Sequence, residues 1–160
     1  MTYESQYTGA IIDEKLTGAY GGIHTHDNST AQAFPTGTTY TKIVNWMDND
    51  PSANTTPDQA NWQITVNKTG VYRIEWSFSF SAGTNNVVSF GSLFVDWVEQ
   101  EWIHFTRKIS TSGDVWNANF SWLASLTSWQ AIDARLRHDN AWSVNFTFSY
   151  KNLNCSRVDV

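Results

Sequence analysis

Two histidines separated by one residue, His24 and His26, are the first candidates for chemistry in this chain, and Asp27 follows them. In an extended segment, side chains two positions apart point the same way, so both imidazoles could bind one metal ion. No further cysteine or histidine cluster accompanies the pair. The sequence therefore predicts no metal site and leaves His24 and His26 as weak candidates. The other two histidines, His104 and His138, are expected to be structural or to lie at the surface.

The remaining polar residues match no catalytic motif. The sequence has no Gly-x-Ser-x-Gly elbow, no His-Glu-x-x-His, no phosphate-binding glycine loop and no Cys-x-x-Cys. The carboxylate pairs Asp48/Asp50 and Glu99/Glu101 fall in expected loops, whereas glycosidases hold two carboxyls about 5–10 Å apart across a cleft. Asp48, Asp50 and Asp58 do not have the spacing of a calcium-binding loop. We therefore expect a protein that is not an enzyme and needs no cofactor.

The elements that would position any site are strands, because apolar residues recur at every second position from Thr38 onward. The clearest segment runs from Val71 to Phe80, where aromatic and aliphatic residues alternate with Arg73, Glu75 and serines. Such alternation is typical of a strand with one buried and one polar face. Three similar segments follow, at 116–126, 132–137 and 142–150. From these buried faces, the core is predicted to contain Tyr72, Ile74, Trp76, Phe78, Phe80, Phe120, Trp122, Leu136, Phe146 and Phe148.

Weaker strand patterns and regular turn signals complete the prediction. The weaker strands are expected at 38–46, 61–66, 86–97 and 101–110. Turn-forming clusters such as Asn67-Lys68-Thr69-Gly70 and Ser112-Gly113-Asp114 separate the strands. About eight short strands at this spacing favour an all-β fold, an antiparallel β-sandwich of the jelly-roll type.

The first 36 residues differ from the rest, with four glycines and no sustained apolar period. They are interpreted as an N-terminal arm, residues 1–36, that precedes a jelly-roll domain over residues 37–160. A disordered tail is one interpretation. The other is an arm that becomes ordered on a partner through the apolar side chains of Tyr7, Ile11, Ile12 and Leu16.

Charge and composition exclude several classes of partner. The net charge is −5 and no segment is strongly basic, so binding to nucleic acid is not expected. No apolar run approaches the roughly 20 residues that cross a bilayer, so no membrane partner is expected. Cys155 is the only cysteine, which leaves no intrachain disulfide. Residues Met1 to Ser5 lack the features of a secretory signal peptide, so we expect synthesis in a reducing cytoplasm.

Several segments resemble the tumour necrosis factor-like jelly roll, as in the globular head of the complement recognition protein. They are Tyr40-Thr-Lys-Ile-Val, Trp62 to Val66, Lys68-Thr69-Gly70-Val71-Tyr72 and Asn145 to Tyr150. The likeness covers about residues 38–150, and Gly70-Val71-Tyr72 is the best match to the step that opens the third strand of that family. The resemblance implies a jelly roll that assembles as a homotrimer. Similar jelly rolls occur in tailed bacteriophages as capsid decoration proteins and fibre knobs.

One departure from the family concerns the face that would surround the threefold axis. Here that face carries polar residues: Arg73, Glu75, Ser77, Asn117, Asn119, Ser121, Asn145, Thr147 and Ser149. Obligate interfaces are usually more apolar, so a trimer built on this face would be wet. The sequence has nine tryptophans, more than one small core needs, and we expect some at subunit contacts. The candidates are Tyr40, Trp46, Trp97 and Trp102.

The resemblance implies a virion structural protein, made in the host cytoplasm, that decorates the capsid of a tailed bacteriophage as a homotrimer. Its partners would be other copies of itself and the major capsid protein or another virion protein. One alternative is a receptor- or glycan-binding knob of a phage fibre, in which exposed tryptophans stack on sugars. A second alternative is a secreted ligand of the tumour necrosis factor or complement type.

Overall fold

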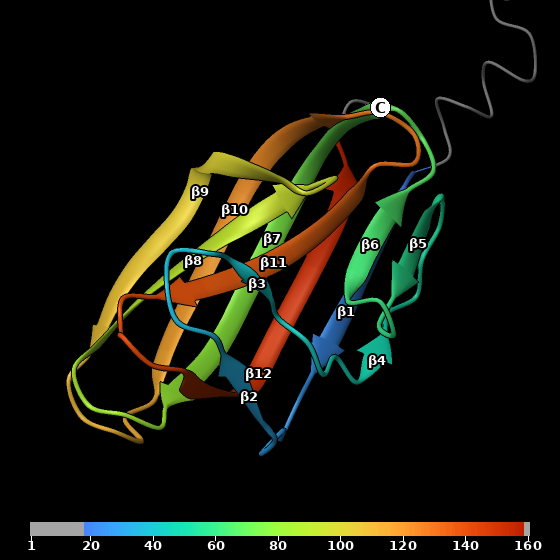
Figure 1. The fold of residues 1–160 in the computed structure, drawn as a ribbon. Coiled ribbons are helices and arrows are strands. Elements are labelled where there is room, and N and C mark those ends of the chain that lie inside the picture. Colours follow the sequence, from blue (N-terminus) through green and yellow to red (C-terminus); the bar gives the residue numbers. More distant parts are fainter. Residues whose placement is uncertain (1–17, 159–160) are drawn as a thin grey trace, which may run out of the picture.

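A computed structural model describes residues 18–158, which form twelve strands and no helix (Figure 1). Each of two antiparallel sheets has six strands. Sheet A has the order β10 (Trp116–Leu126), β7 (Gly70–Ala82), β12 (Val144–Arg157), β1 (Tyr20–Thr25) and β4 (Asp48–Asn49), and β2 (Ala31–Phe34) also pairs with β12. Sheet B has the order β5 (Thr55–Asp58), β6 (Gln63–Val66), β11 (Ala131–His138), β8 (Val87–Val95) and β9 (Val98–Ile109), and β3 (Thr41–Lys42) pairs with β11.

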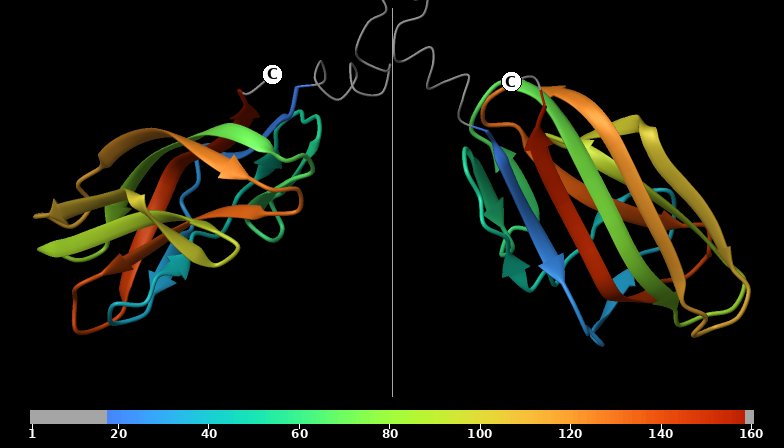
Figure 2. Two further views of the ribbon diagram at one scale, coloured as in Figure 1. Left: turned by 90° about the horizontal axis from the view of Figure 1, so that it is seen from above. Right: turned by 180° about the vertical axis from the view of Figure 1, so that it is seen from behind.

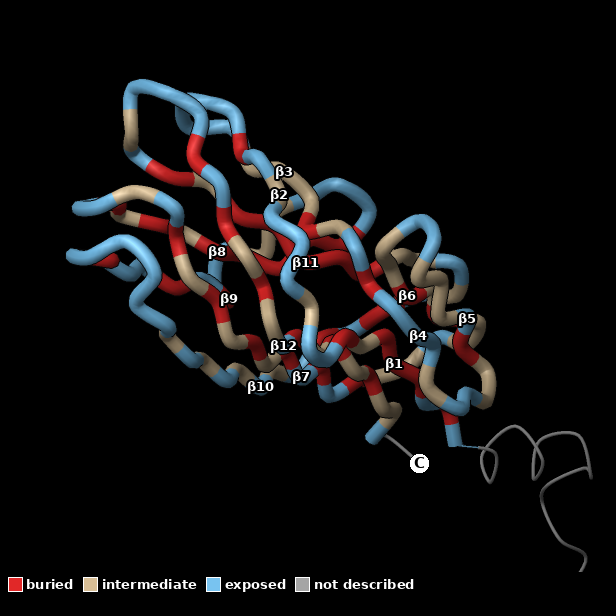
Figure 3. Tube along the Cα trace, turned by 90° about the horizontal axis from the view of Figure 1, so that it is seen from below, coloured by how far each residue is buried: buried red, intermediate tan, exposed pale blue. Residues whose placement is uncertain are grey.

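The two sheets pack face to face as a sandwich, which confirms the predicted fold class (Figure 2). Alternation of buried and exposed positions along the long strands places the core between the sheets (Figure 3). Within the described residues, there is no helix long and apolar enough to cross a membrane.

An aromatic cluster fills the centre of the sandwich. Phe80 stacks on Phe148 with ring centres 5.6 Å apart, and Trp76 packs against Phe78 at 4.6 Å. Phe105 from sheet B lies 5.0 Å from Phe78 and so joins the two layers. Burial of each large ring contributes about 1.5–3 kcal/mol before entropy is subtracted. Eight of the ten predicted core residues are buried; Phe120 and Trp122 are half-buried and pack against the core.

A β-bulge in β12 changes which side chains face the core. The pairing of β12 with β7 shifts between Phe148 and Tyr150, so one residue is added to the strand. The alternation expected from the sequence placed Tyr150 on the buried face with Phe148. Instead Tyr150 is 57% exposed, and Lys151 turns inward and is 2% exposed. The expectation for Tyr150 was wrong because an extra residue inverts the two-residue period beyond it.

Lys151 is a buried cation without a carboxylate beside it in the described structure. Its Nζ donates a hydrogen bond to the carbonyl oxygen of Val44 and lies 5.1 Å from the ring centre of Trp46. Burial lowers the pKa of Lys151 from 10.5 to about 7, because removal from water disfavours the ammonium. The bulge thus places an ionisable group where its charge is costly.

The boundary expected at residue 36 is wrong, because part of the expected arm belongs to the sandwich. β1 pairs with β12 along its whole length, and β2 pairs with Val144 to Thr147. These strands escaped the pattern because β1 contains Gly21 and Gly22, and only Ile23 supplies a bulky core side chain. The predicted anchoring residues Tyr7, Ile11, Ile12 and Leu16 lie outside the described residues.

Candidate functional site

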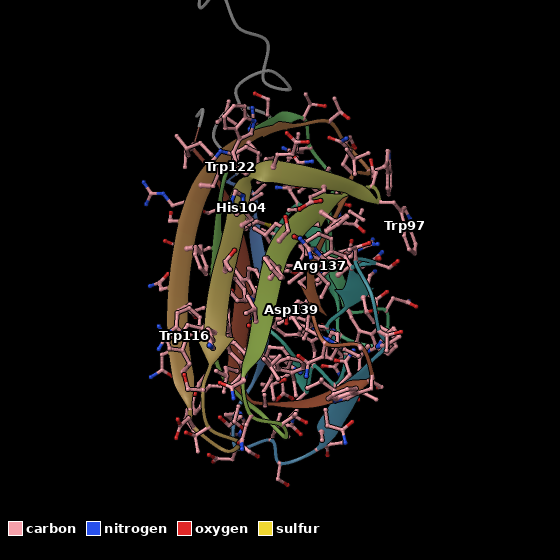
Figure 4. All side chains as sticks on the ribbon, turned by 60° about the vertical axis from the view of Figure 1, so that its left-hand side comes forward. Trp97, His104, Trp116, Trp122, Arg137 and Asp139 are labelled. Carbon is pink, nitrogen blue, oxygen red and sulfur yellow. The ribbon has the colours of Figure 1, made fainter. Side chains whose placement is uncertain are left out.

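On one side of the sandwich, the last strands of the two sheets lie without pairing to each other. β10 is the last strand of sheet A and β9 is the last strand of sheet B. Three large rings of β10 lie along this side: Trp116, Phe120 and Trp122, which we call the aromatic edge. All three are half-buried. Figure 4 shows Trp122 and Trp116 toward opposite ends of β10, and it shows His104 on β9.

The half-buried rings are held from the inside by the core. Trp116 meets Phe80 edge-on with ring centres 5.6 Å apart, and Phe120 stacks on Phe105 at 5.7 Å. The guanidinium of Arg107 lies 5.0 Å from the ring centre of Trp116. Because the opposite sheet ends here, these inward-facing positions keep one side toward solvent. Such contiguous, rigid aromatic surface is typical of an interaction site.

The outer face of sheet B carries a second arrangement, a stack of cations and rings. Arg137 lies 3.9 Å from the ring centre of Phe90 and 5.2 Å from that of Tyr40. Arg135 lies 4.2 Å from the ring centre of Phe94 and 4.5 Å from that of Trp97. We call these six residues the cation–aromatic stack. Guanidinium groups held between rings gain electrostatic attraction that grows as water is excluded.

One acid anchors the stack. Asp133 accepts two hydrogen bonds from Arg135, at 2.6 and 3.0 Å, and its Oδ2 lies 3.2 Å from Lys42 Nζ. Asp133 and Arg135 are buried, although their alternation with Ile132 and Ala134 predicted a solvated face. That expectation was wrong because Lys42 and the aromatic side chains of the stack cover this face of β11.

Trp97 ends the stack at the tight turn between β8 and β9. Asp96 and Trp97 both have left-handed backbone conformations, with φ of 47° and 73°. Two consecutive positive φ values match the twist of a two-residue hairpin but are costly for a bulky side chain. The turn is tied to sheet B, since the Ala131 amide donates to Asp96 Oδ1 at 2.8 Å. Trp97 is 75% exposed, so one ring face packs on Arg135 and much of the rest contacts solvent.

Beside the stack lies a groove of about 510 Å³, lined by Tyr40, Phe90, Glu99, Glu101, His104 and Arg137, among others. Burial raises the pKa of Tyr40, and its contact with Glu99 adds to the rise while Arg137 opposes it. His104 is exposed, with Nδ1 2.8 Å from the Glu101 carbonyl oxygen. The groove combines ring faces with charges of both signs, which suits a polar ligand with hydroxyl or carboxyl groups.

The sequence-predicted subunit residues do not come together at one place. Tyr40 and Trp97 belong to the cation–aromatic stack, whereas Trp102 is 86% exposed on β9 and alternates with the buried Ile103 and Phe105. Trp46 is 6% exposed, and its Nε1 donates to the Ile43 carbonyl at 2.8 Å, so it offers little surface to another chain. Sequence reasoning missed Arg135 and Arg137, because only the pairing of β3 with β11 brings Tyr40 and Lys42 over them.

His138 lies in a different environment from His24 and His26. His138 is fully buried; its Nε2 lies 3.1 Å from the Phe34 carbonyl oxygen, and its Nδ1 accepts from the Asn140 amide. These contacts give it a structural role. His24 and His26 instead lie with their rings stacked at the end of β1, at a centre-to-centre distance of 6.0 Å.

Comparisons with known proteins identify the architecture. No family model matches the sequence, and no curated protein matches it. The structure of Eiger TNF from S. frugiperda is similar with a TM-score of 0.57 and 10% identity, over 88% of this chain and 93% of that one. The globular domain of zebrafish complement 1qA protein is similar with a TM-score of 0.58 and 14% identity, over 86% and 94%. At these identities the likeness shows the fold alone: this chain is a jelly roll of the kind seen in tumour necrosis factor and the complement globular head.

Proposed function

We propose that this chain is a non-enzymatic assembly protein that forms a homotrimer and serves as a virion structural protein. The observation that carries the proposal is the aromatic edge, where Trp116, Phe120 and Trp122 are rigid on one side and open on the other. In the proposed trimer, this edge of one subunit packs against sheet A of the next. Sheet A offers the exposed Tyr150 and Leu123 among its polar residues, which gives apolar contacts within a wet interface.

The proposed oligomeric state is tested by measuring the mass of the protein in solution. We expect sedimentation of the full chain at three times its 18.2 kDa mass. Tyr150→Asp places a charge in the proposed contact and should shift the protein toward monomer, because a central aromatic contact is worth about 2 kcal/mol or more per interface. Trp142→Asp changes an aromatic residue that is also exposed but lies outside the proposed contact, and it should leave the mass unchanged. A wild-type monomer, or equal behaviour of the two variants, would contradict the proposal.

Within the virion, the finer role we propose is decoration of a tailed-phage capsid, with residues 1–17 as the anchor. Removal of residues 1–17 should keep the fold, because β1 begins at Tyr20 and pairs fully with β12. The truncated protein should lose binding to assembled shells of the major capsid protein, measured by co-sedimentation at matched concentration. Binding equal to that of the full chain would exclude the anchor.

A receptor- or glycan-binding knob is the second candidate, and the exposed ring of Trp97 favours it. Aromatic rings fixed by a cation behind them present a flat face on which a sugar can stack. Trp97→Ala should then abolish binding on a glycan array, while Trp142→Ala should not. An array on which the wild-type protein binds no glycan would count against the knob and leave the assembly role in place.

A further inference from the structure

We propose that His24, His26 and Asp48 form a binding site for one divalent transition metal, with Zn²⁺ as the expected ion. The ligand atoms of the three side chains lie within 4.8 Å of one another. They come from the end of β1, the residue just after it, and β4, which is the short strand at the edge of sheet A. All three belong to one chain, so the site does not depend on the proposed trimer.

The strand pairing creates this arrangement. His24 and Asp48 face each other across the β1–β4 ladder, with His24 Nε2 3.8 Å from Asp48 Oδ2. Two ligands of a tetrahedral zinc ion lie about 3.3 Å apart, given bonds of about 2.0–2.1 Å. The ring of His26 is nearly parallel to that of His24, with an angle of 24° between the planes. Because His26 and Asp48 are exposed, small rotations of their side chains can bring the three atoms to bonding distance.

A second carboxylate orients His24. Its Nδ1 is buried and makes no aligned hydrogen bond, and the Asp50 Oδ1 atom at 2.7 Å is the acceptor placed to hold its proton. A proton on Nδ1 leaves the lone pair of Nε2 free to bind an ion, and Nε2 lies 3.8 Å from Asp48 Oδ2. This carboxylate–histidine arrangement is the usual outer shell of a metal-bound imidazole.

Asp50 is itself fixed in place. Its amide donates to the Gly22 carbonyl at 2.9 Å, and the Asn154 amide, oriented to satisfy its neighbours, donates to Asp50 Oδ2 at 3.1 Å. A Cβ at Gly22 would lie 2.4 Å from Asp50 Oδ2, so the glycine makes room for the carboxylate. The segment before β4 is also tied to β1, since the Met47 amide donates to the His24 carbonyl at 3.0 Å. The site is therefore held by backbone contacts before any ion binds.

The set of donors selects the ion. Two imidazoles and one carboxylate suit Zn²⁺, whereas Ca²⁺ and Mg²⁺ prefer oxygen ligands throughout. Three protein ligands leave a fourth position for water or for a donor from a partner. The bound ion would connect the segment after β1 to β4 and so stabilise this edge of sheet A.

The test is calorimetric titration of the full chain with zinc sulfate, with magnesium and calcium chlorides as separate arms. We expect one Zn²⁺ per chain and no saturable Mg²⁺ or Ca²⁺ binding. His26→Ala and Asp48→Asn each remove a ligand at an exposed position and should weaken Zn²⁺ binding at least tenfold. Asp50→Asn should weaken it by about 10–100-fold through loss of the outer shell. His104→Ala is the matched control and should bind as the wild type does.

A second readout does not depend on heat changes. Co²⁺ bound at a four-coordinate site gives intense visible absorption, and this absorption should disappear in His26→Ala and persist in His104→Ala. Circular dichroism of each variant checks that the fold is kept. Absence of Zn²⁺ binding by the wild type, or equal binding by His26→Ala and wild type, would overturn the site; neither result bears on the proposed trimer, which sedimentation measures separately.

Discussion

Replacement of Lys151 by methionine is expected to raise the free energy of unfolding at pH 6 by about 1–4 kcal/mol, the range found when buried charges give way to apolar groups. In the folded protein the pKa of Lys151 is lowered to about 7, whereas the unfolded chain has the ordinary value of 10.5. Between these pH values the unfolded chain binds more protons, so wild-type stability rises with pH across the window. The slope should reach about 1.4 kcal/mol per pH unit. Below pH 7 the folded protein holds a buried ammonium and bears the full penalty.

The sign of the effect should change at high pH. Near pH 10.5 neutral Lys151 still donates to the Val44 carbonyl, and methionine leaves that oxygen without its donor, at a cost of about 1–3 kcal/mol. Urea unfolding at pH 6, 8 and 10 measures the curve. Lys108→Met, at an exposed position on β9, is the control and should keep the wild-type pH dependence. If Lys151→Met unfolded with the same pH slope as the wild type, the lysine would not be the source of the dependence.

Gly91→Ala is expected to destabilise the protein by about 1–3 kcal/mol or more, as overpacking of a dense core does. A Cβ at Gly91 would lie 1.8 Å from the ring of Phe105. That ring cannot move aside easily, because it is enclosed by Phe78, Trp116 and Phe120 at centre distances of 5.0–5.7 Å. Gly83→Ala is the matched control, since its Cβ would meet only ordinary contacts at 3.5 Å or more.

A double variant separates the clash from a loss of strand propensity. Phe105→Leu removes part of the ring that Gly91→Ala would strike, so the two changes together should cost less than their sum. Thermal unfolding of the four proteins in this cycle gives the coupling. Strict additivity would show that the methyl group does not meet the ring.

The sequence predicted correctly those strands that have one face buried in the core and the other face exposed to solvent. β7 is the clearest case, because Tyr72, Trp76 and Phe80 are buried while Arg73 and Glu75 are exposed. The prediction of buried and exposed positions failed where burial depends on contacts between strands that are distant in the sequence. No pattern in the chain marks the bulge that exposes Tyr150, and no pattern marks the covering of Asp133.

The candidate surfaces were accessible to sequence reasoning only in part. Trp97 and Trp102 could be singled out as tryptophans without a clear place in the core, and both are exposed. Trp46 also had no clear place in the predicted core, but it is buried because the loop after β3 packs it over Lys151. The His24–Asp48 contact could not be foreseen, since β4 is two residues long and has no period of its own.

The unpaired edge of β10 has a consequence for an isolated chain. This strand ends sheet A with eleven residues and carries no lysine, proline or acid, the side chains that usually prevent a further strand from adding to a sheet. The last strand of sheet B, β9, does carry charged side chains of this kind, Arg107 and Lys108. An isolated chain therefore presents an edge to which a strand of another copy could add, and the proposed trimer would protect the protein from such fibre growth by covering this edge.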